Sequence, residues 1–212
     1  MSNTLDWSFN RKEIAQDFEK HVRSQLPWYG LATNMVKWIV ENYIPVNGVL
    51  YDIGASTGNI TSACSDIINA RCVEAISIEN SSEMVKIWNG VGSINQTNAQ
   101  DFEYKDFDVA VLFLTAMFLT VGDREILINK LMRSKKAGGA IILIDKFCDV
   151  GGFEGTVLRR ITMRQKIESG EEPKDILDKD LSLSGIQRPM LVSELPDSTK
   201  FFQAGEFSGY IL

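Results

Sequence analysis

The sequence predicts an α/β fold in which helices alternate with the strands of a mostly parallel central sheet. Short apolar runs, such as 49–53 and 107–114, are separated by segments whose apolar residues recur with helical spacing. The run 107–114 is almost continuously apolar, which is typical of a strand covered by helices on both faces. Alternation of this kind requires crossover connections, and crossovers join parallel strands.

Length and composition fit one globular domain. The chain has 212 residues, of which 44% are hydrophobic and 24% are charged, enough for a single core. We expect one domain over 1–212. Within it, 1–45 is expected to form an N-terminal helical cap, and 148–200 a variable segment that contacts substrate or a second copy. No apolar run has the length of a membrane span, and the polar N-terminus does not resemble a signal peptide.

The charge balance gives no strong nucleic-acid signal. There are 22 basic against 28 acidic residues, a formal net charge of −6, whereas nucleic-acid binding draws on clustered Lys and Arg. A local basic group stands at Arg159, Arg160, Arg164 and Lys166, on a predicted helix. Both a solvated helix face and a substrate-facing patch remain open for it.

Cysteine and histidine usage predicts no metal site. Cys64, Cys72 and Cys148 are odd in number and lack metal-ligand spacing, and His21 is the only histidine. Free thiols in a reducing compartment are the expected state, so we expect a cytoplasmic protein.

The elements of the first half follow from periodicity and from Pro and Gly at their boundaries. They are expected in this order: helices at 10–25 and 29–43, a strand at 49–53, a helix from about 59, a strand at 73–78, a helix at 82–88 and a weak strand at 93–97.

The second half continues the alternation and then departs from it. The expected elements are a strand at 107–114, a helix at 123–132, a glycine turn at 137–139, a strand at 140–144, a charged helical region at 153–180, and a final strand pair or one bent strand at 201–212.

A glycine-rich turn follows the first strand directly, in Asp52-Ile53-Gly54-Ala55-Ser56-Thr57-Gly58. Glycine lets the backbone turn tightly and approach a ligand, and the next helix directs N–H groups at the same place. A side chain at Gly58 is therefore expected to occupy ligand volume. A tight strand-to-helix turn without a ligand is the alternative.

Glu79, 21 residues after Gly58, ends the second strand. A carboxylate at this position can accept hydrogen bonds from a ribose diol, and a surface acid is the alternative. The turn lacks the glycine spacing of the pyrophosphate fingerprint. Asp52 suits the ammonium group of an amino-acid tail, so the residues favour S-adenosylmethionine over NAD.

The order of the motifs resembles the carboxy-S-adenosylmethionine synthase family over nearly the whole chain. The similar segments are Asp6-Trp7-Ser8-Phe9, Arg23 to Tyr29, Tyr51 to Gly58, Glu79-Asn80-Ser81 with Met84, Thr115 to Leu119, Lys136 to Gly139, Asp145-Lys146-Phe147, Arg188 with Met190-Leu191, and Phe201 to Phe207.

This resemblance implies a Rossmann-like class I methyltransferase fold and a site for S-adenosylmethionine or its carboxylated form. Asn98 and Ala99 would read the adenine edge, Tyr29 would help close the site, and Arg188 would pair with the extra carboxylate. For Arg188 a surface ion pair is the alternative. The full set of expected cofactor-binding residues is Tyr29, Asp52, Gly54, Ala55, Ser56, Gly58, Glu79, Asn80, Asn98, Ala99, Phe113 and Arg188.

The chain also departs from the family pattern. Glu79 and Asn98 stand where the family carries Asp, Phe113 stands where it carries Asn, and the segment after Arg188 is short. We therefore expect an S-adenosylmethionine-dependent methyltransferase whose acceptor and catalytic residues the sequence does not identify. Alternatives are an enzyme that makes or uses carboxy-S-adenosylmethionine, and a non-catalytic cofactor-binding module. The expected partners are a small-molecule cofactor and, as a candidate, a second copy of the chain.

Overall fold

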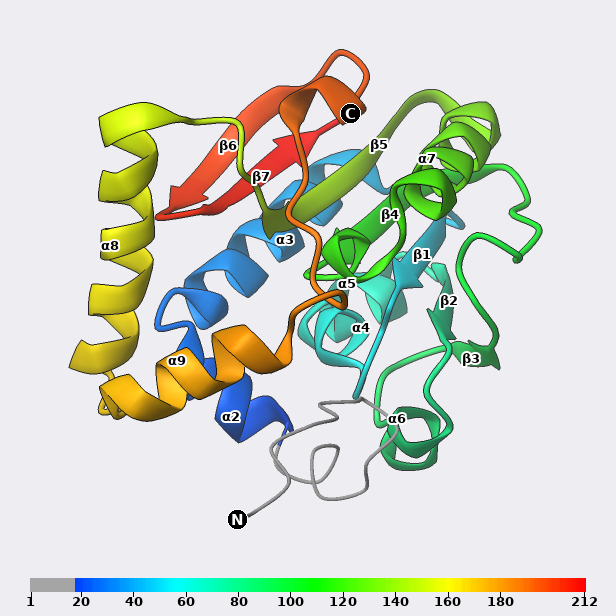
Figure 1. Ribbon diagram of the computed structural model, residues 1–212. Coiled ribbons are helices and arrows are strands. Elements are labelled where there is room, and N and C mark those ends of the chain that lie inside the picture. The colour runs from blue at the N-terminus through cyan, green and yellow to red at the C-terminus, as the bar shows by residue number, and fades with distance from the viewer. Residues whose placement is uncertain (1–17) are drawn as a thin grey trace.

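The computed structural model describes the backbone of residues 18–212 and the side chains of residues 22–212 (Figure 1). Seven strands of this part form one sheet in the order β3-β2-β1-β4-β5-β7-β6. The strands are β1 (Val49–Ile53), β2 (Glu74–Glu79), β3 (Ser93–Gln96), β4 (Phe107–Phe113), β5 (Lys135–Lys146), β6 (Thr199–Ala204) and β7 (Phe207–Ile211).

Strands β1 to β5 run parallel, whereas β7 pairs antiparallel with both β5 and β6. The mostly parallel sheet confirms the fold class, and the hairpin of β6 and β7 confirms the strand pair among the two alternatives for the tail. The glycine turn expected at 137–139 lies inside β5 as an irregularity. At this point the pairing register shifts: Phe107 of β4 pairs with Lys135 of β5, and the next pair is Val109 with Ala140.

Helices fill the connections. They are α2 (Phe18–Gln25), α3 (Tyr29–Tyr43), α4 (Asn59–Ala63), α5 (Ser65–Ala70), α6 (Ser82–Ile87), α7 (Val121–Ser134), α8 (Gly152–Glu168) and α9 (Pro173–Ser182), with short 3₁₀ turns η1 (Ala116–Phe118) and η2 (Val192–Glu194). The single helix expected from about 59 is divided at Cys64, and the helical region at 153–180 is two helices.

Alternate residues of the central strands face two separate cores. Leu50 and Val109 join the core under α3, α4 and α5, while Tyr51 and Ala110 join the core under α7. Side chains of a strand point to opposite faces in turn, so helices must cover both faces to bury them. This is why the strands read as continuous apolar runs.

The described part of the N-terminal segment packs closely on the rest of the chain. Helix α3 contacts β4 and β5 and belongs to the main core, and α2 contacts α8. Residues 10–17 of the expected first helix, and the segment 6–9, lie outside the described residues. Trp28 is buried in the core, with its ring centroid 5.1 Å from that of Phe202 and 5.0 Å from that of Phe207.

Strand β1 lies between β2 and β4, so the chain order reverses direction at the pair β1 and β4. In open α/β sheets a crevice forms beyond the carboxyl ends of the strands at such a reversal, and ligands bind there. Within residues 18–212, no helix combines the length and apolar character that crossing a bilayer requires.

Candidate functional site

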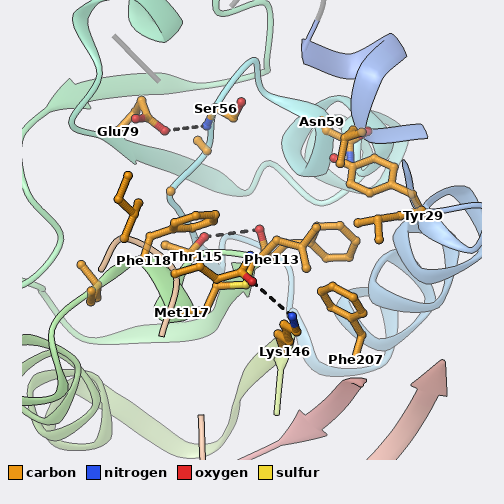
Figure 2. A pocket seen from close by; sticks show the side chains of 18 of the residues that line it. Tyr29, Ser56, Asn59, Glu79, Phe113, Thr115, Met117, Phe118, Lys146 and Phe207 are labelled. Atoms are coloured by element: carbon orange, nitrogen blue, oxygen red, sulfur yellow. Dashed lines mark hydrogen bonds between the residues drawn. The ribbon is translucent and has the colours of Figure 1, made fainter. Parts of the chain in front are cut away.

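A cavity of about 540 Å³ opens beyond the carboxyl ends of β1, β2 and β4, within the roughly 300–1,000 Å³ range of small-molecule sites. Its wall has two parts. One part is formed by the turns that follow β1, β2, β3 and β4, and the other by α2, α8, α9, the end of β5 and the start of β7. Figure 2 shows Glu79 and Ser56 in the first part, Lys146 and Phe207 in the second, and Phe113, Thr115 and Met117 between them.

The turn after β1 adopts left-handed backbone at Gly54, Ser56 and Gly58, with φ of 72°, 49° and 93°. A Cβ at Gly54 would lie 2.4 Å from the Thr115 side chain, and one at Gly58 would lie 2.5 Å from the backbone nitrogen of Gly90. The expectation that a side chain at Gly58 would enter ligand volume is therefore wrong. Gly58 is outside the cavity wall, and the adjacent space is filled by protein.

Glu79 is held in place by backbone donors. It is 8% exposed, and its two carboxylate oxygens accept hydrogen bonds of 2.8 Å from the N–H groups of Ser56 and Ser81. Burial raises the pKa of Glu79, while the backbone donors lower it. A carboxylate has four lone pairs in all, so these backbone donors leave acceptor capacity for a ligand.

Asp52, at the end of β1, is a buried carboxyl group with an unused acceptor. Its side chain is 2% exposed, and Oδ2 has no hydrogen-bond partner among the described residues. The pKa of Asp52 is raised to about 7, chiefly by burial and to a smaller extent by the nearby Glu79, while the N–H of Thr61 acts in the opposite direction. Asp52 lines the cavity, and a buried acceptor without a partner on a cavity wall is expected to meet a donor from a ligand or water.

The turn after β3 presents a different set of side chains from the one expected. Ala99 and Asn80 line the cavity, whereas Asn98 stands outside it, accepting from Asn80 Nδ2 at 3.3 Å and donating to Asp101 at 2.9 Å. Gln100 lines the cavity, and its Oε1 is buried without a partner among the described residues. No sequence pattern indicated Gln100, because a glutamine in a turn has no characteristic spacing.

The end of β4 forms the middle of the cavity. Leu114 has a φ of 58°, which ends the strand one residue earlier than expected. The Thr115 hydroxyl donates to the Ile53 carbonyl at 3.0 Å and so ties the turns after β1 and β4 together. Tyr29 meets Phe113 edge to face, with centroids 5.0 Å apart, and both rings line the cavity (Figure 2).

Arg188 is not part of the cavity wall. Its N–H donates to the Met117 carbonyl at 2.6 Å, its carbonyl accepts from Arg124 Nη1 at 2.9 Å, and its own Nη1 donates to the Ile186 carbonyl at 3.1 Å. Gln187, one position earlier, lines the cavity instead and accepts from Lys146 Nζ at 3.4 Å.

The basic group of α8 divides between solvent and cavity. Arg159 pairs with Asp180 at 3.3 Å, and Arg164 pairs with Glu168 at 2.7 Å, both on the surface. Lys166 lines the cavity, together with Lys179 of α9. Sequence reasoning did not identify Lys179, because its place depends on how α9 packs.

Of the twelve expected site residues, the structure brings nine to one cavity wall: Tyr29, Asp52, Gly54, Ala55, Ser56, Glu79, Asn80, Ala99 and Phe113. Gly58, Asn98 and Arg188 lie outside that wall. Among residues 18–212 no group of three or more His, Cys, Asp or Glu side chains is arranged to hold a metal ion.

Comparison with known proteins agrees with this geometry. A family model described as a methyltransferase domain matches residues 51–143. A carboxy-S-adenosyl-L-methionine synthase of Staphylococcus epidermidis is 28% identical over 197 residues, which cover 91% of this chain and 86% of the relative. The enzyme of the same name from Shewanella loihica is 26% identical, with 97% and 86% covered.

Solved structures share the fold. A plantazolicin methyltransferase in complex with SAH aligns with a TM-score of 0.58 and 14% identity, covering 86% of this chain and 65% of its own. Human N-acetylserotonin methyltransferase in complex with SAM aligns with a TM-score of 0.60 and 11% identity, covering 96% and 56%. The chain thus spans less than two thirds of either of these proteins.

The methyltransferase family match covers β1 to β5, and these strands carry the turn after β1, the Glu79 carboxylate and the cavity at the reversal point. The synthases align over most of this chain and over most of their own length. Residues 51–143 therefore match a methyltransferase domain, and the described part of the chain has the Rossmann-like fold of class I methyltransferases.

Proposed function

We propose that the cavity binds S-adenosylmethionine and that the protein transfers the one-carbon group of this cofactor to an acceptor bound in the second part of the cavity. The observation that carries the proposal is the pair of buried carboxyl groups, Asp52 and Glu79, at the ends of two adjacent strands in one cavity wall. One suits an ammonium group and the other a ribose diol.

Unused polar atoms on the wall fit such a ligand. Asp52 Oδ2, Gln100 Oε1 and Gln25 Oε1 are buried without partners among the described residues, and all three side chains line the cavity. An acceptor in this condition costs free energy unless a donor reaches it. We assign Asp52 to the amino-acid tail, Glu79 to the ribose, and Gln100 with Asn80 and Ala99 to the adenine.

The transfer step requires little acid–base chemistry from the side chains. Bound in this way, S-adenosylmethionine supplies a one-carbon group on a sulfonium, which is a good leaving group. The protein contributes alignment of the acceptor with that group and exclusion of water. The rings of Tyr29 and Phe113 form an apolar wall that supports both roles.

Titration of S-adenosylmethionine and SAH into the purified protein tests the proposal, with Asp52→Asn and Glu79→Ala as variants. We expect one site per chain, at least tenfold weaker in each variant. A wild-type protein that binds neither ligand would refute the proposal.

A second candidate is an enzyme that makes or uses the carboxylated cofactor. It is favoured by relatives with the synthase name that align over most of the chain. Arg188, the expected clamp for the extra carboxylate, lies outside the wall, and this keeps the plain methyl donor as our first proposal. A mass spectrum of the cofactor that co-purifies with the protein distinguishes the two.

Three further assignments belong to the same proposal. Residues 1–212 act as one domain, with 148–200 supplying acceptor contacts, since α8 and α9 line the cavity. The free thiols Cys64, Cys72 and Cys148 suit a reducing compartment such as the cytoplasm. Phe153 is 71% exposed and Leu181 is 61% exposed, and such side chains are suited to a homodimer contact, which light scattering would detect.

A further inference from the structure

Three lysines from separate elements line the second part of the cavity. Lys146 ends β5, Lys166 lies in α8 and Lys179 lies in α9. Figure 2 places Lys146 across the cavity from Glu79, with Met117 and Phe113 between them. The cavity therefore has an acidic part, with Asp52 and Glu79, and a second part that is lined by the three lysines and by one carboxylate, that of Asp180.

The carboxylates near Lys166 have other partners. Asp180 pairs with Arg159 at 3.3 Å, Glu206 lies 3.8 Å from Lys146, and Glu171 accepts the Ser24 hydroxyl at 2.9 Å. No carboxylate of the described residues forms an ion pair with Lys166 within 4 Å. The charge of Lys166 thus faces the cavity without a close counter-ion from this part of the chain.

Each lysine also makes the charged form of its neighbouring lysine less favourable. Burial and the nearby charge of Lys166 together lower the pKa of Lys179 to about 8, against the opposing effect of Glu171. Burial likewise lowers the pKa of Lys166, with Lys146 as the next cause. Like charges gathered at the edge of a cavity are unfavourable on their own, and an anion that binds between them removes the repulsion.

We propose that Lys166 and Lys179 form an anion subsite that holds a carboxylate or phosphate group of a small-molecule acceptor. The inference rests on the proposed function, because it places the acceptor in the part of the cavity opposite the cofactor. A lysine ammonium is a compact point charge that suits either anion. The acceptor is then an acidic molecule. Its anionic group binds the two lysines, and its reacting atom is oriented toward the middle of the cavity.

The subsite is tested by NMR on protein with ¹³C-labelled lysine, saturated with SAH, to which malonate or inorganic phosphate is added at constant ionic strength. We expect saturable shifts of the Lys166 and Lys179 signals, and the anion that binds more tightly names the group recognised. Lys166→Met and Lys179→Met should each weaken anion binding at least tenfold, with SAH affinity within threefold of wild type.

Lys174→Met is the matched control, since Lys174 also lies in α9 but pairs with Asp178 on the surface; it should leave anion binding unchanged. If a Met variant fails to fold, Lys166→Gln and Lys179→Gln replace it. Signals of the two lysines that respond to neither anion would overturn the inference. The inference would also be overturned if the Met variants lost SAH affinity as strongly as anion affinity, because the lysines would then bind the cofactor. If the proposed function itself is wrong, the wild-type protein will not bind SAH, and this result is distinct from the loss of anion binding.

Discussion

The backbone N–H of Ser56 donates a 2.8 Å hydrogen bond to the carboxylate of Glu79. The end of β2 thereby fixes the turn after β1, in which Ser56 takes a left-handed conformation. A non-glycine residue in that region is strained and persists where its surroundings hold it. The carboxylate expected to bind a ribose is thus also the group that shapes the neighbouring turn.

Replacing Glu79 with Ala should weaken S-adenosylmethionine binding about 10- to 100-fold, roughly 1.5–3 kcal/mol, because a charge-assisted acceptor is lost. Titration calorimetry measures the affinity, and circular dichroism verifies that the variant is folded. Glu83→Ala, in α6 outside the cavity, is the control and should bind as wild type does. Unchanged affinity in folded Glu79→Ala would assign Glu79 a purely structural role.

Cofactor affinity should depend on pH through Asp52. Its pKa is raised to about 7 by burial, so in the free protein the carboxyl is mostly protonated below that pH and ionised above it. An ammonium group favours the ionised form, and binding at lower pH must release a proton. Affinity should therefore rise by up to about tenfold per pH unit toward pH 7 and level off above it.

Titrations across that range in several buffers measure both the affinity and the proton release. Asp52→Asn should bind more weakly and show a flat profile. If the Asn variant retains the wild-type slope, another group is responsible for it, and the assignment of Asp52 to the ammonium group fails.

Gly58→Ala should destabilise the fold by about 1–2 kcal/mol, since an L-residue is disfavoured in left-handed backbone. Gly58 has a φ of 93°, and the new Cβ would lie 2.5 Å from the nitrogen of Gly90. Urea unfolding measures the effect. Gly122→Ala in α7, where nothing lies within 4 Å, is the control and should be neutral or stabilising. Equal effects of the two substitutions would contradict this account of the turn.

Arg188→Ala distinguishes the two candidate cofactors. If Arg188 clamps a second carboxylate, the variant should lose about 2–5 kcal/mol of affinity for carboxy-S-adenosylmethionine and far less for S-adenosylmethionine. Because its side chain lies outside the cavity wall, we expect near-wild-type binding of S-adenosylmethionine. Equal losses for both ligands, or none for either, would remove the carboxylated-cofactor candidate.

Arg124→Met should destabilise the protein by roughly 3 kcal/mol, as expected when one partner of a buried ion pair is removed. Arg124 is 1% exposed, lies 2.9 Å from Glu194 and donates to the Arg188 carbonyl. Thermal unfolding measures the loss. Arg133→Met in the last turn of the same helix is the control, and a similar loss there would indicate a general effect on α7.

The α/β class and the order of the elements could be predicted from local patterns, namely apolar runs typical of strands buried on both faces and helical spacing. The sequence also placed Asp52 and Glu79 correctly at one wall, since both end adjacent parallel strands and the carboxyl ends of such strands meet at one edge. Most strand ends shifted by a residue or two, as at Leu114, whereas β5 already begins at Lys135 and includes the expected glycine turn.

Which residues beyond the strand ends reach the cavity could not be predicted, because it depends on the packing of distant segments. Gln187 lines it and Arg188 does not, because the Arg188 backbone is fixed between Met117 and Arg124. Lys166 and Lys179 meet at the cavity through the packing of α8 and α9, which are separate in sequence. Such contacts depend on how whole elements pack against one another, and local periodicity carries no information about that arrangement.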